Sequence, residues 1–152
     1  MINSILVATD ASAASNRALA MAAQLAEFHK AELHIIHVIR DMQLPFEIKE
    51  IPELETTTFE SFNNAREEIM RKIAETVLKA AKAKAQQIGA DKVQTVIGVG
   101  DPATSILGTA KRREIDMIVI GTRGLGKLKG KILGSVSRKV TNNAETNCLI
   151  VR

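Results

Sequence analysis

The residues best suited to chemistry lie in one glycine-rich, basic stretch that runs from position 121 to position 137. It holds five glycines and four basic side chains before the next helix: Gly121, Arg123, Gly124, Gly126, Lys127, Lys129, Gly130, Lys131 and Gly134. Glycine lets backbone amides approach an anion closely and turn toward it. Micromolar binding needs about 8 kcal/mol, whereas one helix terminus supplies only about 0.3–2 kcal/mol. Several donors must therefore converge, and the mixture of donors in this stretch predicts a polyphosphate ligand.

Two structural elements must position this stretch. The apolar run Met117–Ile120 before it is typical of a strand buried on both faces. Ser135, Val136 and Ser137 begin a helix predicted over 135 to about 142, whose first turn offers free N–H groups and a positive dipole end. In open α/β sheets, ligands bind beyond the carboxyl ends of strands. The alternative is a glycine-rich connector that only closes the strand-to-helix turn.

Familiar phosphate-binding motifs do not account for the stretch. Gly121 to Lys127 fits the front of a Walker A loop, but Leu128 stands where the Mg²⁺-binding hydroxyl belongs. The dinucleotide fingerprint G-x-G-x-x-G is also absent. We therefore interpret the Walker match as chance.

A longer spacing, Gly121-x₂-Gly124-x₉-Gly134-Ser135, resembles the nucleotide-binding signature of the universal stress protein family. The likeness extends to four further segments, Ile5–Asp10, His37–Val38, Gly100–Pro102 and Asp116–Gly121. It implies a single universal stress protein domain over residues 1–152, with an adenine nucleotide alpha hydrolase-like fold. Asn147-Cys148 departs from the Cys-Pro that opens the last strand in many members.

The resemblance also implies a set of site residues. Adenine and ribose would be held by Ala8, Thr9, Asp10 and Val38, and phosphates by Gly121, Arg123, Gly124, Gly134, Ser135, Val136 and Ser137. The implied ligand is ATP, with ADP and AMP left open, carrying Mg²⁺ or Mn²⁺ that Asp10 could contact. Alternatively, Asp10 caps the following helix, and Ser135 could cap the last helix while binding phosphate. No catalytic residue is predicted.

The remaining pattern alternates strands with helices. We predict strands over 2–9, 32–39, 92–99, 117–120 and 147–151, and helices from Ser12 or Ser15, over 59–88, from Pro102 and over 135–142. Alternation favours one parallel sheet with helices on both faces, a doubly wound α/β domain. Because the chemical signals follow the first and fourth strands, the strand order 3-2-1-4-5 is favoured over 2-1-3-4-5; the resemblance implies the same order.

Helical periodicity predicts which faces are buried. The first helix should bury Leu19, Ala22, Ala23 and Ala26, and the long helix Phe62, Ile69, Ile73, Val77 and Ala81. The basic triplet Lys111–Arg113 ends a helix at the opposite sheet edge, so we interpret it as structural. Segment 40–58, with Pro45 and Pro52, is predicted to be irregular, as either a functional excursion or a disordered connector.

Charge and composition exclude several classes of protein. The formal net charge is +4, but residues 111–139 alone carry +7 and the rest of the chain −3. Such a local field attracts small anions without making the whole surface basic. The absence of Trp and Tyr disfavours binding of nucleic acid by stacking. One cysteine excludes an internal disulfide and fits a reducing cytoplasm. No apolar run reaches the roughly 18 residues of a membrane span.

Two functions follow from these features. The resemblance implies an ATP-binding regulatory switch in stress response, forming a homodimer through the last strand, Asn147–Val151. The alternative is a slow ATPase or autophosphorylating enzyme that uses the same pocket. Phosphoryl transfer needs a positioned nucleophile as well as charge neutralisation. No residue stands out as the base that would orient water, so efficient turnover is not expected.

Overall fold

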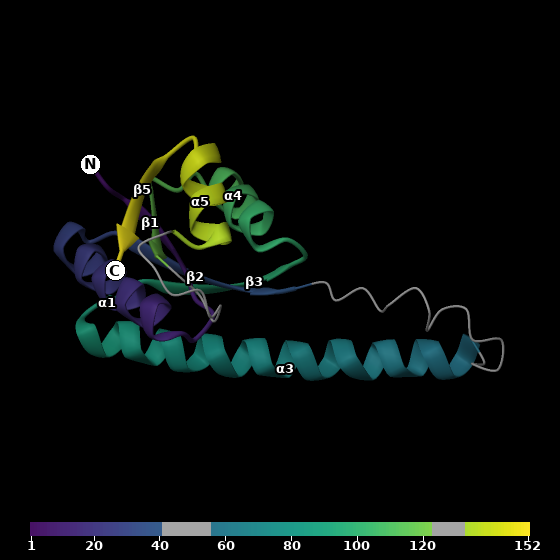
Figure 1. The fold of residues 1–152 in the computed structure, drawn as a ribbon. Helices are drawn as coiled ribbons and strands as arrows, with labels where there is room; N and C mark the ends of the chain where they lie inside the picture. Colours follow the sequence, from purple (N-terminus) through teal and green to yellow (C-terminus); the bar gives the residue numbers. More distant parts are fainter. Residues whose placement is uncertain (41–55, 123–132) are drawn as a thin grey trace.

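A five-stranded parallel sheet carries the fold, with helices on both faces (Figure 1). The computed structural model describes residues 1–40, 56–122 and 133–152. Its elements are β1 (Ser4–Ala8), α1 (Ala13–His29), β2 (Glu32–Ile39), α3 (Thr56–Ile88), β3 (Val93–Val99), α4 (Pro102–Arg112), β4 (Met117–Gly121), α5 (Ser135–Asn143) and β5 (Asn147–Val151). The sheet order β3-β2-β1-β4-β5 confirms the predicted order and fold class. The predictions for residues 41–55, Arg123 and Gly124 lie outside the described residues.

The central strand β1 sets the register of the sheet. Val7 of β1 pairs with Ile35 of β2 on one side and with Val119 of β4 on the other. All three side chains are fully buried, because helices cover both faces of the sheet, and this explains the near-continuous apolar strands. Since every strand is parallel to its neighbours, their carboxyl ends share one edge.

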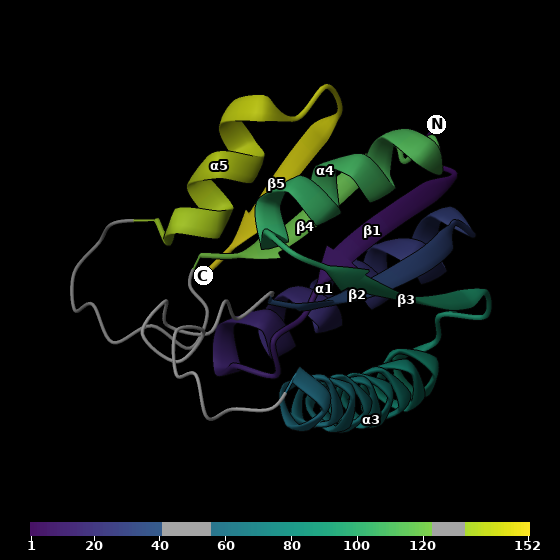
Figure 2. The same ribbon diagram turned by 90° about the vertical axis from the view of Figure 1, so that its right-hand side faces the viewer.

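The two helical layers enclose separate cores. Helices α1 and α3 lie on one face and α4 and α5 on the other (Figure 2). The first core joins α1 and α3 to the sheet and is built mainly from alanine on the helices and larger aliphatic residues on the strands. The second joins α4 and α5 to the same strands through their alternate side chains. The strand pair β1–β4 contributes to both.

Helix α1 packs close to the sheet because its inner face is small. The predicted face of Leu19, Ala22, Ala23 and Ala26 is buried as expected, each at most 2% exposed. Ser12 is the N-cap, since its side chain accepts a hydrogen bond of 3.2 Å from the Ser15 amide. The sequence left Ser12 and Ser15 as alternatives, and only the first fits the cap geometry.

Helix α3 differs from its prediction in two ways. It begins at Thr56 rather than at residue 59. Its buried residues are Ala74, Leu78, Ala81 and Ala85. The predicted burial of Phe62, Ile69 and Ile73 is wrong, because these side chains are 55%, 57% and 48% exposed. The amino-terminal half of α3 extends past the sheet (Figure 1), so among the described residues no core cluster lies beneath that part of the stripe.

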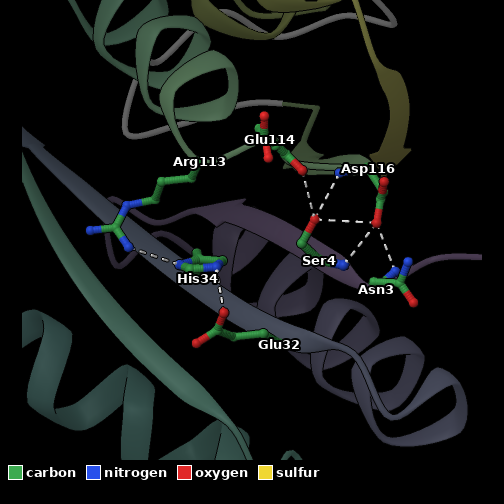
Figure 3. A network of polar contacts seen from close by, with 7 residues as sticks. All are labelled: Asn3, Ser4, Glu32, His34, Arg113, Glu114 and Asp116. Atoms are coloured by element: carbon green, nitrogen blue, oxygen red, sulfur yellow. Dashed lines mark hydrogen bonds and ion pairs between the residues drawn. The ribbon is translucent and has the colours of Figure 1, made fainter.

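A polar network ties β1 to the start of β4 at the amino edge of the sheet (Figure 3). One carboxylate oxygen of Asp116 accepts hydrogen bonds from the amides of Asn3, at 2.7 Å, and Ser4, at 3.0 Å. The Asp116 amide in turn donates to the Ser4 hydroxyl at 3.0 Å. The hydrogen bond from the Asn3 amide is the largest cause that lowers the pKa of Asp116. Asp116 thus serves as a structural anion at the edge opposite the glycine-rich stretch.

His34 of β2 lies near the same amino edge of the sheet and is buried, with only 4% of its surface exposed. Its Nδ1 lies 3.4 Å from a guanidinium nitrogen of Arg113, and its Nε2 lies 3.3 Å from a carboxylate oxygen of Glu32. A guanidinium can only donate, so we assign Nδ1 as the acceptor and place the single proton on Nε2. Burial lowers the pKa of His34, and Arg113 lowers it further against the opposing effect of Glu32. This contact gives Arg113 the structural role predicted for the basic triplet.

Replacing Ala22 with leucine should destabilise the fold. Ala22 is fully buried between α1 and the sheet, so Ala22→Leu should lower the free energy of unfolding by about 1–3 kcal/mol through overpacking. Urea denaturation followed by circular dichroism measures the change. Ala83→Leu, at an exposed position of α3, is the matched control and should have little effect. Equal stability of both variants would contradict the close packing of α1.

The buried histidine should make stability depend on pH. The pKa of His34 is below 6.5 in the folded chain, so the unfolded chain takes up the proton first as pH falls. The contribution of neutral His34 to the free energy of unfolding is fully present above pH 6.5. It is lost as the pH falls below 6.5, at a slope of at most about 1.4 kcal/mol per pH unit, until His34 is protonated in the folded chain as well. His34→Gln should reduce the loss of unfolding free energy between neutral and mildly acidic pH, whereas His29→Gln should retain it. Equal pH slopes in His34→Gln and the wild type would contradict this role.

Candidate functional site

The turn after β1 is held by its own hydrogen bonds. The Thr9 amide donates to the Ile36 carbonyl at 2.9 Å, and the Thr9 hydroxyl accepts from the Ala11 amide at 3.2 Å. The same hydroxyl lies 3.3 Å from that of Ser15, and Thr9 is only 5% exposed. Ala11 has a φ of 63°, in the left-handed region that few non-glycine residues adopt. These hydrogen bonds hold the turn in one conformation, and the Thr9 hydroxyl is one of the groups that hold it.

Asp10 occupies the next position of this turn and is half-buried. One of its carboxylate oxygens accepts a hydrogen bond of 3.0 Å from the Ser12 amide. This two-residue reach is an Asx-turn, and it brings the chain into α1 with Ser12 as the helix cap. The alternative role predicted for Asp10, as a cap, is thus seen at the turn before the helix rather than at the N-cap itself.

His37 contacts the β1 turn from the end of β2. Its Nδ1 lies 2.9 Å from the Thr9 carbonyl oxygen. A carbonyl only accepts, so Nδ1 carries the proton and donates it. Sequence patterns do not predict this contact of His37, although a polar residue near the end of a strand beside β1 is a signal that could have indicated it. Val38, the next residue, is half-buried and pairs with Gly98 of β3.

Gly121 ends β4 where α1 begins. A Cβ atom at this position would lie 2.8 Å from the carbonyl carbon and 2.9 Å from the carbonyl oxygen of Ala14, and 3.1 Å from the amide nitrogen of Ser15. These are backbone atoms that cannot move aside easily, so only glycine fits. The spacing motif predicted Gly121 as a ligand contact; the structure adds helix packing as a second reason for glycine at this position.

The two ends of the glycine-rich stretch meet at the carboxyl edge of the sheet. The Gly134 amide donates to the Thr122 carbonyl at 2.8 Å. The Ser137 hydroxyl lies 2.8 Å from the Gly121 carbonyl oxygen and 3.2 Å from that of Thr122. Ser137 is only 3% exposed, and its hydroxyl holds the start of α5 against the end of β4. The amides of 121–122 and 134–137 are thereby held in one region next to α1.

Helix α5 has a glycine, Gly134, as its N-cap residue. Gly134 has no side chain, so the N-cap residue itself supplies no acceptor to the first turn. By contrast, α1 is capped by Ser12 and α4 by Asp101. The first amides of a helix need partners from outside the helix, so the start of α5 combines amide donors with the positive end of the helix dipole.

The predicted residues thus divide into three groups. The structure brings Ala8, Thr9, Asp10, Val38 and Gly121 to neighbouring strand ends at one edge. It places Gly134, Ser135, Val136 and Ser137 beside the end of β4 through the hydrogen bonds above. Arg123 and Gly124 belong to the part of the chain outside the described residues.

Two surface hollows lie away from these residues. One, of about 690 Å³, runs between α4 and α5 and is bordered by Leu107, Ile118 and Lys139. The other, of about 520 Å³, lies at the amino edge near Ile2 and Thr146. Neither includes a residue predicted to bind nucleotide, so the candidate site rests on the turns at the carboxyl edge. Within the described residues, no group of three acidic, histidine or cysteine side chains could hold a metal ion.

Comparison with known proteins identifies the family. The model of the universal stress protein family matches residues 1–152. Universal stress protein YxiE of Bacillus subtilis is 37% identical over 156 residues, covering 100% of both chains. A universal stress protein of Thermus aquaticus is 31% identical, again over 100% of both chains. None of the helices in the described ranges could cross a lipid bilayer.

Solved structures agree with this assignment. Hypothetical protein MJ0577 superposes with a TM-score of 0.82 at 28% identity, covering 99% of this chain and 96% of that one. A universal stress protein in complex with cAMP superposes with a TM-score of 0.69 at 26% identity, covering 99% and 97%. Together, the full-length family match, the relatives and the shared sheet order show that this chain belongs to the universal stress protein family.

Proposed function

We propose that this protein binds an adenine nucleotide at the carboxyl edge of β1, β2 and β4 and acts as a regulatory switch in stress response. The observation that carries the proposal is the closure of the glycine-rich stretch, in which the Gly134 amide and the Ser137 hydroxyl reach the carbonyls that end β4. That closure lies beside the Thr9–Asp10 turn. The relative in complex with cAMP supports an adenine nucleotide as the class of ligand.

Each part of the nucleotide has candidate partners. The backbone of Ala8, Thr9 and Val38 would border the adenine, and Asp10 would accept from a ribose hydroxyl. The amides of Gly121, Gly124 and Ser135–Ser137 would donate to phosphate oxygens, aided by the guanidinium of Arg123 and by the net charge of +7 over residues 111–139. The Gly134 amide is bonded to the Thr122 carbonyl, so Gly134 would contribute by leaving room for the phosphates to approach. Shared among several such donors, the roughly 8 kcal/mol that micromolar binding requires is reachable.

A triphosphate would bring its own cation. Mg²⁺ or Mn²⁺ bound to the phosphates needs oxygen ligands, and Asp10 is the acidic side chain of the β1 turn that could complete its shell. We propose ATP as the ligand, with ADP and AMP as weaker alternatives, because the donors extend from the β1 turn to the start of α5.

A switch also needs a route from the site to a partner. The Thr122 amide donates to the Val151 carbonyl at 2.8 Å, so the turn after β4 is joined to the edge strand β5. We propose that two copies pair through β5, Asn147–Val151, and that nucleotide binding changes this contact. The single cysteine, Cys148, supports a cytoplasmic location because no internal disulfide is possible.

Blocking the approach of the backbone should abolish nucleotide binding. Gly134 has φ of −60° and ψ of 158°, which other residues adopt readily, so Gly134→Val should fold while its side chain obstructs the amides. We expect affinity for ATP, measured by isothermal titration calorimetry, to fall by at least about tenfold, a change of about 1.4 kcal/mol. Gly108→Ala in α4, where the added carbon meets only the end of the Arg112 side chain, is the control. Unchanged affinity in Gly134→Val would overturn the assignment.

Turnover should be slow if the site serves as a switch. Asp10 already accepts a hydrogen bond from the Ser12 amide, which weakens it as a base for positioning water. We expect single-turnover experiments with labelled ATP and Mg²⁺ or Mn²⁺ to show that hydrolysis of bound ATP is many times slower than its dissociation from the protein. Phosphate release faster than ATP dissociation would instead favour the ATPase.

A further inference from the structure

The amino-terminal half of α3 buries no side chain against the other residues that the structure describes. Within residues 60–88, the first buried side chain is Ala74, and none of residues 60–73 is buried. Figure 1 shows this amino-terminal half extending past the ends of the strands. A helix of 33 residues is about 50 Å long, and residues 60–73 account for roughly 20 Å of it.

The projecting half carries large apolar side chains on one side. Phe62, Ile69 and Ile73 are 55%, 57% and 48% exposed. Their spacing of seven and then four residues places them along a single stripe, and Arg66 and Thr76 complete a heptad-like series. Single exposed apolar residues are ordinary, but an apolar row along an otherwise solvated helix is typical of a contact surface.

Charge along α3 is divided between its two halves. Residues 56–70 contain three acidic side chains and one basic one, whereas residues 71–88 contain one acidic and five basic ones. The net charges are therefore −2 and +4. Two α3 helices packed antiparallel would place the acidic half of each beside the basic half of the other. Parallel packing would place like charges together. Acidic residues near the start of a helix and basic residues near its end are also favoured by the dipole of a single helix. The antiparallel orientation of the two α3 helices therefore needs a direct test.

We propose that this stripe is an interface between two copies of the chain, with their α3 helices antiparallel and crossing at Ile69. A two-fold axis there sets Ile69 against its own copy, Ile73 against Arg66, and Phe62 against Thr76. Such an interface is self-complementary, as a closed dimer requires. The two sheets lie at opposite ends of the helix pair, because in each copy the buried part of α3 begins at Ala74.

This interface is separate from the pairing proposed for β5. Helix α3 packs on β2, β3 and α1, whereas β5 lies at the other edge of the sheet. One copy could therefore use both surfaces at once and form assemblies larger than a dimer. A contact of about 15 residues of one helix per copy falls in the small class of interfaces, below about 1,200 Å², so association should be weak and dependent on concentration.

Sedimentation velocity of the full chain over a wide range of concentration tests the interface. Ile69→Lys puts two like charges at the two-fold axis and should weaken association by at least about tenfold. Because Ile69 is 57% exposed, the variant should keep its fold, which urea denaturation checks. Phe28→Lys on α1, where the side chain is 82% exposed, is the matched control and should associate like the wild type. Wild-type association that Ile69→Lys leaves unchanged would overturn the proposal, as would a wild type that is monomeric throughout.

Disulfide cross-linking tests the orientation. Cys148 is the only cysteine, so Cys148→Ser gives a clean background. In that background, Ile69→Cys should cross-link to its own copy. A mixture of Phe62→Cys and Thr76→Cys chains should form the mixed dimer in preference to either symmetric dimer. Cross-links between two copies of Phe62→Cys in preference to the mixed dimer would indicate parallel packing and overturn the antiparallel arrangement.

Discussion

The parallel pairing of β1 with β4 at the centre of the sheet is the constraint on which the rest of the structure depends. Ile5, Val7 and Val119 are fully buried because helices cover both sides of this pair. After β1 the chain continues to β2 at one side, and after β4 it continues to β5 at the other. Two connections therefore leave in opposite directions from adjacent strand ends, which is the arrangement at which open α/β sheets generally bind their ligands.

The two edges of the sheet are held by different means. At the amino edge, the Asp116 carboxylate joins Asn3 and Ser4, and His34 is held between Glu32 and Arg113 (Figure 3). Ionisable side chains there are bonded either to main-chain amides, as Asp116 is, or to one another, as His34 and its neighbours are, and they stabilise the fold. At the carboxyl edge, most contacts join main-chain groups or short hydroxyls, as in the Thr9 turn and the Gly134–Thr122 pair.

Sequence patterns predicted local structure well and distant contacts poorly. The strands and the inner face of α1 follow from periodicity, because a buried strand and an alanine-rich face leave a direct pattern in neighbouring residues. The same reasoning failed for Phe62 and Ile69, since periodicity identifies an apolar side but not what covers it. The contact of His37 with Thr9 and the approach of Ala14 to Gly121 join residues distant in sequence. Only the packed fold brings them together, so neither could be predicted from spacing.

Closure of the glycine-rich stretch bears on how a switch could work. Because Gly134 and Ser137 already reach the end of β4, a ligand would find the start of α5 already placed beside that strand end, and this preorganisation reduces the cost of binding. A ligand shifts an equilibrium only by its different affinity for the two states. A switch of the proposed kind therefore requires that nucleotide contacts alter the Thr122–Val151 hydrogen bond or the β4–β5 register. A nucleotide bound equally well in both arrangements of β5 would leave the partner contact unchanged, however tightly it bound.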